Sequence, residues 1–396
     1  MSDSPEFALF GAQPLFSEPK PTGNLYRPSV ERFLEYSRLF FKNKCYTNDG
    51  ELCRMLESRL AEFHAVKRVV SVNSGFWGHV LAFHALALPG RREIIAPAFG
   101  YRRTDDMIAW ASFIPHFCDV DPETLCPSVE TIKAALNEST ALILAPHPMV
   151  NCSDAQGIEE LGRALAIPVV FDSVEAGYRA HKNRRIGGFG DAEVFSMHST
   201  KLLNASEGGY VTTNNTVLAD RLESMKHFGF VRGDTVEDGM ALNAKFNEVH
   251  AAMALASLDE IEEQIARHRR KYELYRAGLR DIDGLTIVEQ QEAERPDYRL
   301  IVVRIGASWP LSREDTLRLL EAEKALARPY YAPLHHKVVD YPRICPELPV
   351  TEAIFREFMV LPCGSHVSED DVGKIVDLLA RIRRSGPQPK SFGKTA

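Results

Sequence analysis

The chain has 396 residues and a mass of 44.4 kDa, enough for two or three domains with a large buried core. Its 45% hydrophobic and 26% charged residues are ordinary globular values, which exclude a disordered or fibrous chain. A formal net charge of -7 provides no basic surface for nucleic acid or an anionic membrane, and no run approaches the ~20 apolar residues of a membrane span.

The chain start and the cysteines predict a cytoplasmic protein. The first residues lack the basic segment and apolar stretch of a secretory signal peptide. The seven cysteines are an odd number and contain no CxxC pair, so the sequence predicts neither a disulfide framework nor a zinc site. We therefore expect buried free thiols and no bound metal.

The first part of the chain is predicted to be an arm followed by a large domain. Residues 1–40 are rich in proline and aromatic residues and are expected to form an irregular N-terminal arm. The large domain is expected over residues 41–260. Its first helix is predicted where apolar residues recur at helical spacing from Leu52 to Phe63, with Asn48 or Asp49 as N-cap.

Short apolar runs then alternate with helical segments over about 150 residues. Strands are predicted at seven such runs: Arg68–Val72, Glu93–Ala96, Ile114–Cys118, Ala141–Ala145, Val169–Asp172, Ala192–Ser196 and Gly209–Thr213. The helical segments between them include Gly78–Ala87, Thr104–Ala111, Val129–Leu136 and Ile158–Ala166. This alternation predicts an α/β fold whose mostly parallel sheet is covered by helices on both faces, with ligand sites at the carboxyl ends of the strands.

A helical stretch from Asn247 to Leu279 is predicted to connect the large domain to a small α+β C-terminal domain over residues 261–385. The basic run at residues 267–271 within it is interpreted as a solvated helix face. The polar tail at residues 386–396 is expected to be flexible. Two strands and two helices are predicted in the small domain: Gly284–Val288, Tyr298–Ile305, Arg313–Glu323 and Glu369–Ile382.

Three predicted strand ends carry groups that suit one cofactor. Asp172 ends one strand, Lys201 follows another that ends at Ser196, and Ser74 and Gly75 form a turn between a strand and a helix. Taken singly, these are equally an N-cap, a surface lysine and a simple turn. Together they offer a helix start for a phosphate, an acid for a pyridinium nitrogen and an amine for a Schiff base. That set of groups favours pyridoxal phosphate chemistry.

Several segments occur in the order of a known family's motifs. FDSVEAGY is similar to D-A-A-x-A-x-G, and SMHSTKLLNASEGGYVTTN is similar to S-F-x-x-T-K-x-x-x-x-x-E-G-G-x-V-x-T-N. PAFGYRRT, CDVDPETLCPSVETIKAAL, LNAKFNEVH and YYAPLHH match weaker motifs. Over about residues 10–382 the chain resembles the DegT/DnrJ/EryC1/StrS family of pyridoxal-phosphate-dependent sugar aminotransferases. The resemblance implies fold type I, with a mixed, mostly parallel sheet in the large domain.

The resemblance also implies roles for individual residues. Lys201 would form the imine with pyridoxal phosphate and then move protons, while Asp172 would pair with the pyridine nitrogen. The ring of Tyr101 would stack on the cofactor, and Glu175 would lie beside its phenolic oxygen. Asn243 occupies a position that contacts the phosphate of the neighbouring subunit's site, so a homodimer with shared active sites is implied. The implied phosphate cradle consists of Gly75, Phe76, Trp77 and Ser196, and the implied sugar site is bordered by His335, His336 and Arg102.

The sequence departs from the family pattern near the cofactor. Phe76 and Trp77 replace a threonine and a small residue, and Glu175 replaces Gln or His. A carboxylate beside the phenolic oxygen is expected to raise one pKa by like-charge repulsion. Variation of the core and an altered acceptor both remain open as explanations.

The resemblance predicts transfer of an amino group from glutamate to a nucleotide-linked keto-deoxysugar, with dTDP-4-keto-6-deoxyglucose favoured. Such amino sugars serve antibiotic or polysaccharide biosynthesis. The alternative is a pyridoxal-phosphate-dependent lyase or dehydratase, or a cyclitol aminotransferase. A third class, a non-catalytic scaffold, is opposed by the presence of both Lys201 and Asp172.

Overall fold

The computed structural model describes residues 6–23, 26–231, 235–236, 239–291, 294–332, 334 and 342–386. Its largest sheet has seven strands. In spatial order these are β2 (Arg68–Val72), β10 (Gly209–Thr213), β9 (Ala192–Ser196), β6 (Val169–Asp172), β5 (Thr140–Pro146), β3 (Glu93–Pro97) and β4 (Ile114–Cys118). Only β10 within this sheet runs antiparallel to its neighbours. All seven predicted runs are in this sheet, which confirms the mixed, mostly parallel arrangement.

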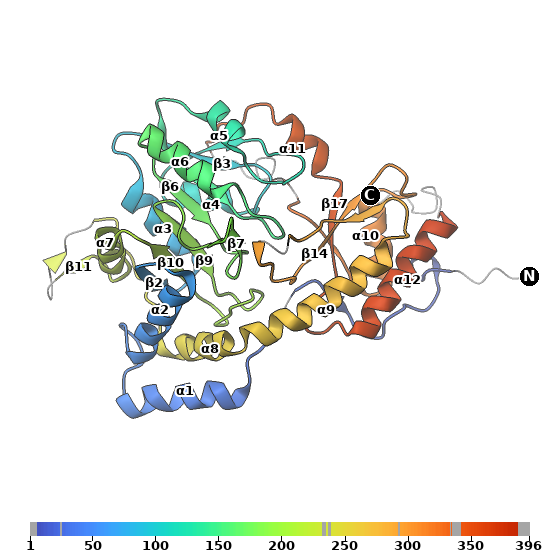
Figure 1. Cartoon of the computed structure of the whole chain (residues 1–396), viewed down its shortest axis with the longest axis horizontal. Coiled ribbons are helices and arrows are strands. Elements are labelled where there is room, and N and C mark those ends of the chain that lie inside the picture. The colour runs from blue at the N-terminus through green and yellow to red at the C-terminus, as the bar shows by residue number, and fades with distance from the viewer. Residues whose placement is uncertain are drawn as a thin grey trace, which may run out of the picture.

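Helices cover both faces of the large sheet because alternate strand residues are buried on opposite sides (Figure 1). In β6, Val170 packs into one core cluster, while Val169 and Phe171 pack into the other. The first cluster is completed by α3 (Gly75–Leu86), α4 (Thr104–Trp110) and α7 (Thr216–Lys226). The second is completed by α2 (Glu51–His64), α5 (Val129–Ala135), α6 (Ala155–Leu165) and α8 (Glu248–Asp259).

A second sheet has four antiparallel strands. Their order is β13 (Leu285–Ile287), β14 (Ile301–Ile305), β17 (Phe358–Leu361) and β16 (Arg328–Pro329). The helices of this part of the chain are α9 (Ile261–Leu279), α10 (Arg313–Ala322), α11 (Pro349–Ile354) and α12 (Glu369–Ser385). Figure 1 shows α9 leading from α8 toward this sheet, with α12 beside it. The two predicted strands and two predicted helices are confirmed, although β14 begins at Ile301 and not at Tyr298.

The remaining elements are short. The helical stretch predicted from residue 247 is interrupted at Glu260, which separates α8 from α9. Three two-stranded pairs complete the fold, and a turn of 3-10 helix (Ala8–Phe10) lies near the chain start. The pairs are β1 (Lys20–Pro21) with β15 (Ala325–Leu326), β7 (Ala180–His181) with β8 (Arg184–Arg185), and β11 (Phe230–Val231) with β12 (Thr235–Val236).

The prediction of an irregular N-terminal arm is wrong over its last part. Residues from Val30 onward form α1 (Val30–Asn43), because Ser29 caps its start by accepting a hydrogen bond from the Arg32 amide. The helix also presents Phe33 and Phe40 to the core. The proposed domain boundaries at residues 41, 261 and 386 stay predictions, and residues 387–396 lie outside the described part of the chain.

Three smaller predictions need correction. The N-cap of α2 is Gly50, because Asn48 and Asp49 both adopt left-handed backbone angles. The run at residues 267–271 is not wholly solvated, since His268 is buried. All seven cysteines are free, but Cys345 is exposed and Cys45 only half-buried. Among the described helices, none is long and apolar enough to cross a membrane.

Candidate active site

A cavity of about 440 Å³ opens at the carboxyl ends of β2, β6 and β9. This is the sheet edge at which α/β folds bind ligands. Arg299 and Arg328 reach the cavity from the second sheet and the residues just before it, so both parts of the chain form its wall. Eight of the residues predicted from the sequence line it: Gly75, Phe76, Tyr101, Arg102, Asp172, Glu175, Ser196 and Lys201.

The turn after β2 has the geometry of an anion site. Ser74 is the N-cap of the 12-residue helix α3, and its hydroxyl accepts a hydrogen bond from the Trp77 amide at 3.3 Å. The positive end of the helix dipole therefore points into the cavity. Gly75 allows close packing of this turn on β9, since a Cβ at this position would lie 3.2 Å from the Phe195 carbonyl oxygen.

The antiparallel strand β10 begins directly beside this turn. A Cβ on Gly209 would lie 2.4 Å from the Gly75 amide nitrogen and 2.7 Å from the Phe195 carbonyl oxygen. No side chain fits there without moving backbone. Gly209 is the second glycine of the E-G-G segment in the family motif. Its lack of a side chain allows β10 to lie this close to the start of α3.

Asp172 ends β6 and is 4% exposed. Its Oδ1 accepts a hydrogen bond from the Val174 amide at 3.3 Å, and the Nε2 atom of His79 lies 3.6 Å from the same oxygen. His79 comes from α3 and is itself 1% exposed. A buried acid at a strand end, facing the cavity, is suited to hold a protonated ring nitrogen.

Lys201 is part of a buried charge cluster. Its Nζ atom lies 2.5 Å from Oε1 of Glu175, and the other carboxylate oxygen of Glu175 accepts from the Arg299 guanidinium. Burial alone would raise the pKa of Glu175, but the two cations lower it to about 2. The like-charge repulsion predicted from the sequence concerns Glu175 and the phenolic oxygen of a bound cofactor, so it stays a prediction. The sequence does not show Arg299 beside this carboxyl group.

Arg299 is fixed by several contacts in addition to Glu175. It donates to the Thr200 carbonyl oxygen at 3.2 Å, next to Lys201 in the chain, and its Nε lies 3.7 Å from Asp297. Its side chain is 4% exposed. The residues just before the second sheet therefore contribute a cation that contacts both Glu175 and the backbone beside Lys201.

Among the described residues, two predicted site residues, Trp77 and Asn243, do not line the cavity. The Trp77 ring packs on the Trp110 ring with centroids 5.8 Å apart. The prediction for Trp77 concerned its backbone amide, which donates a hydrogen bond to the Ser74 hydroxyl. Asn243 lies outside the wall, where its carbonyl oxygen accepts from the Asn73 side chain. His335 and His336 lie outside the described residues, so their border role stays a prediction.

Sequence reasoning missed His79, Arg299 and Arg328, all of which line the cavity. His79 lies five residues after Ser74, one helical turn beyond the phosphate turn, and this spacing is the only local signal for it. Arg299 and Arg328 approach from parts of the chain about a hundred residues after Lys201. No local pattern places them at the cavity.

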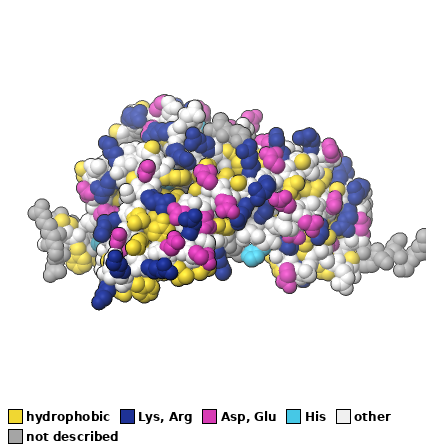
Figure 2. All heavy atoms as spheres, turned by 60° about the horizontal axis from the view of Figure 1, so that its bottom comes forward, with side chains coloured by type: hydrophobic (Ala, Val, Ile, Leu, Met, Phe, Trp, Pro, Cys, Tyr) yellow, Lys and Arg dark blue, Asp and Glu magenta, His cyan; other side chains and the backbone are white. Residues whose placement is uncertain are grey.

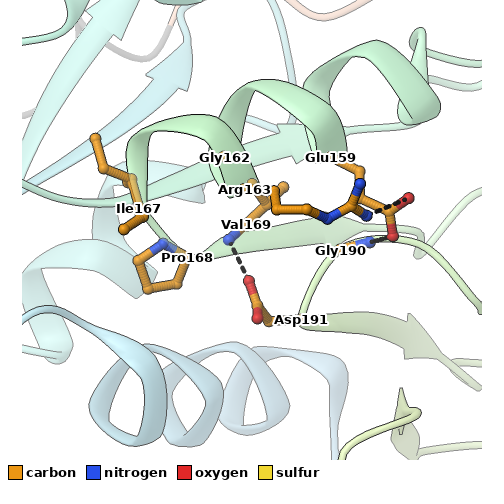
Figure 3. A pocket seen from close by; sticks show the side chains of 9 residues that line it. Glu159, Gly162, Arg163, Ile167, Pro168, Val169, Gly190 and Asp191 are labelled. Atoms are coloured by element: carbon orange, nitrogen blue, oxygen red, sulfur yellow. Dashed lines mark hydrogen bonds and ion pairs between the residues drawn. The ribbon is translucent and has the colours of Figure 1, made fainter.

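A separate hollow of about 320 Å³ lies at the opposite end of β6 (Figure 3). Its polar groups bond to one another: Asp191 accepts from the Val169 amide at 2.8 Å, and Glu159 accepts from the Gly190 amide and pairs with Arg163. Because these polar groups already bond to one another, the hollow offers few hydrogen-bonding groups to a ligand.

A family model matches residues 29–380, and its description is the DegT/DnrJ/EryC1/StrS aminotransferase family. The chain belongs to this family. It is accordingly a pyridoxal-phosphate-dependent aminotransferase. The predicted type I fold is confirmed, and the family implies a nucleotide-sugar substrate and an amino donor.

Relatives of this aminotransferase are similar along nearly the whole chain. The dTDP-4-amino-4,6-dideoxy-D-glucose transaminase of Shigella dysenteriae is 26% identical, over 90% of this chain and 97% of that protein. The L-glutamine:2-deoxy-scyllo-inosose aminotransferase of Streptomyces lividus is also 26% identical, over 84% and 86%. A crystal structure of DesI in the presence of its TDP-sugar product superposes with a TM-score of 0.90 at 30% identity, covering 96% and 97%.

The cavity of the aminotransferase fits the cofactor. It offers a helix start for the phosphate, a buried acid at Asp172 and an amine at Lys201 within one wall. The Nε2 atom of His79 is buried beside Asp172 without a hydrogen-bond partner among the described residues, which marks this end of the cavity as a site for charged groups.

Proposed function

We propose that this enzyme transfers an amino group from glutamate to the keto group of a nucleotide-linked deoxysugar, with dTDP-4-keto-6-deoxyglucose as the favoured acceptor. The names of the relatives support this choice, since the transaminase of Shigella dysenteriae forms a dTDP-linked 4-amino-4,6-dideoxy sugar by its name. The crystal structure of DesI is described as one in the presence of its TDP-sugar product. Arg102 and Arg328 in the cavity wall supply positive charge for a diphosphate.

In this proposal four residues of the wall, Asp172, Lys201, Glu175 and Tyr101, have assigned tasks. Asp172 holds the ring nitrogen of pyridoxal phosphate in its protonated form, and the bound cofactor then supplies an electron sink for the carbon that loses a proton. Lys201 takes that proton on Nζ and returns it to the neighbouring carbon. A proton on Nζ is stabilised by the Glu175 carboxylate at 2.5 Å. Tyr101, at the mouth and 47% exposed, would cover the cofactor ring.

The observation that supports this proposal best is that Lys201, Asp172 and the start of α3 all face one cavity. We expect the purified protein with pyridoxal phosphate to absorb visible light, and Lys201→Ala to lose that absorbance. Glutamate should bleach the band in the wild-type protein. With isotope-labelled glutamate and a panel of keto-sugar nucleotides, mass spectrometry should detect the label in an amino-sugar product.

Failure of glutamate to bleach the band would contradict a glutamate-dependent transaminase. A second candidate is a cyclitol aminotransferase, because the Streptomyces lividus relative is named for 2-deoxy-scyllo-inosose and L-glutamine. Labelled glutamine with that ketone tests it in the same assay. A lyase or dehydratase would consume the keto sugar without any amino donor, so a donor-free reaction separates this alternative.

We infer further that the enzyme is a homodimer with shared sites. Asn243 is not among the residues that line the cavity of its own chain, which is compatible with a contact to the site of a neighbouring chain. Exposed apolar side chains on α1 support an interface, since Val30 is 63% and Phe41 64% exposed. Figure 2, which brings the lower side of Figure 1 forward, shows hydrophobic patches among the charged side chains. Analytical ultracentrifugation should give twice the chain mass; a monomer at micromolar concentration would contradict this.

The cytoplasmic location stays a prediction.

A further inference from the structure

His79 is a buried histidine that the proposed chemistry does not yet use. It lies on α3, the helix whose first turn forms the proposed phosphate site, and it lines the cavity at the position of Asp172. The side chains of His79 and Asp172 are 1% and 5% exposed. Their facing atoms, Nε2 and Oδ1, are 3.6 Å apart. Water therefore does little to screen the charges of this pair.

The hydrogen bonds of the ring determine where its protons lie. The Nδ1 atom is 2.8 Å from the Gly75 carbonyl oxygen. A carbonyl oxygen only accepts hydrogen bonds, so Nδ1 must carry a hydrogen. In a neutral ring the Nε2 atom would then present a lone pair to Asp172, and two electron-rich groups would face each other in a buried place. A second proton on Nε2 turns this repulsion into attraction.

We propose that His79 is a positioning residue that carries a proton on Nε2 and so keeps Asp172 ionised and oriented toward the cofactor's ring nitrogen. The proposal rests on the role proposed above for Asp172. A carboxylate left alone in a buried site tends to take up a proton, and it would then lose its hold on a protonated pyridine nitrogen. The positive charge of His79 removes that tendency.

The same ring joins two ends of the cofactor site. Through Nδ1 it is bonded to Gly75 in the phosphate turn, and through Nε2 it faces the acid at the end of β6. The distance between the phosphate turn and the acid is thereby fixed through one rigid side chain. Three other charged groups of the wall, Glu175, Lys201 and Arg299, interact with one another. The wall also contains Arg102 and Arg328. Among the described residues, only His79 has a basic nitrogen within 4.0 Å of the Asp172 carboxylate.

The test uses the holoenzyme with pyridoxal phosphate labelled at the ring nitrogen. We expect nitrogen NMR of the wild-type protein to report a protonated ring nitrogen, and His79→Phe to shift the signal toward the unprotonated form. The cofactor dissociation constant of His79→Phe should rise roughly tenfold, as expected for the loss of one charged contact. His84→Phe on the same helix is the matched control, because His84 does not line the cavity, and it should change neither quantity.

A protonated ring nitrogen in a folded His79→Phe variant with unchanged cofactor affinity would overturn the proposal. If that variant does not fold, the histidine nitrogens of the wild-type protein decide the question. They should include a ring protonated at both nitrogens that becomes neutral in Asp172→Asn, and its absence from the wild-type protein would equally overturn the proposal. Neither readout needs a sugar, so failure of the proposed amino transfer leaves this result independent.

Discussion

At the scale of single residues, the charge of Glu175 is strongly set by its surroundings. Arg299 and Lys201 hold its pKa at about 2 in the folded protein, below the usual 4.5, against the effect of burial. Because the pKa is lowered on folding, the charged form adds stability above about pH 4.5. This contribution is lost as the pH falls toward 2.

We therefore predict that Glu175→Gln removes part of the acid sensitivity of folding. The wild-type protein should lose about 3 kcal/mol of unfolding free energy through this group between about pH 5 and pH 2. Glu175→Gln should lack that part of the slope, although it is less stable at neutral pH because two buried cations lose their anion. Urea unfolding at a series of pH values measures both.

The matched control for this prediction is Glu207→Gln. Glu207 also lines the cavity, but its side chain is 62% exposed, so water screens its charge and the slope should not change. Equal acid slopes in wild type and Glu175→Gln would show that the charge cluster contributes no pH-dependent stability.

At the same scale, the sequence was sufficient to place Lys201 and Asp172 at the cavity but not to identify the groups beside them. Asp172 ends one predicted strand and Lys201 follows five residues after the end of another, so the chain order alone gives the edge of the sheet to which they belong. Of the two cations beside Glu175, Arg299 comes from beyond two long helices, and no local pattern predicts that contact. For this reason the sequence alone could not show that a cation from so far along the chain lowers the pKa of Glu175.

At the scale of elements, the start of α2 depends on a residue far along the chain. Gly50 has no side chain to cap the helix, and the Leu52 and Cys53 amides instead donate to the carboxylate of Glu248, each at 2.9 Å. Glu248 is the first residue of α8 and is 1% exposed. The local sequence predicted a cap at Asn48 or Asp49 because it could not show this acceptor.

We predict that Glu248→Ala destabilises the fold by about 2–4 kcal/mol, since two buried amides lose a charged acceptor. Glu51→Ala, in the exposed first turn of the same helix, should cost no more than about 1 kcal/mol. Urea unfolding of both variants gives the comparison. A loss for Glu248→Ala as small as for Glu51→Ala would mean that the amides find other acceptors.

Strands were predicted better than helix ends for a related physical reason. A buried strand in such a sheet is a short apolar run with both faces covered, and β2 and β6 begin and end where their runs do. The antiparallel direction of β10 has no such signature in its five residues. The direction of a strand depends on which strands it pairs with across the sheet. The local sequence shows only that an apolar strand is present.

At the scale of the whole molecule, shared sites make a prediction about mixed subunits. Lys201→Ala and Asn243→Ala should each be inactive or nearly so as homodimers. After the two are unfolded together and refolded as a mixture, half of the dimers should be mixed. Each mixed dimer then has one site with both residues intact, so amino transfer should recover to about a quarter of the wild-type rate.

The activity assay of the refolded mixture, compared with each variant refolded alone, measures this recovery. Activity no higher than that of the separate variants would show that Asn243 serves its own chain or no site at all. If activity recovers but ultracentrifugation shows only monomers, the recovery cannot come from sites shared between two subunits.

The contact of Gly209 with the Gly75 amide has a practical consequence for anyone who wishes to redirect the enzyme to new acceptors. A library that varies Phe76 or Arg102 changes side chains at the wall and leaves the backbone frame in place. A library that varies Gly209 presses on the main chain beneath the phosphate turn, where the nearest atom lies 2.4 Å from any added carbon. We expect variants at Gly209 to lose binding of pyridoxal phosphate before they accept a new sugar. Screening effort therefore belongs at Phe76 and Arg102.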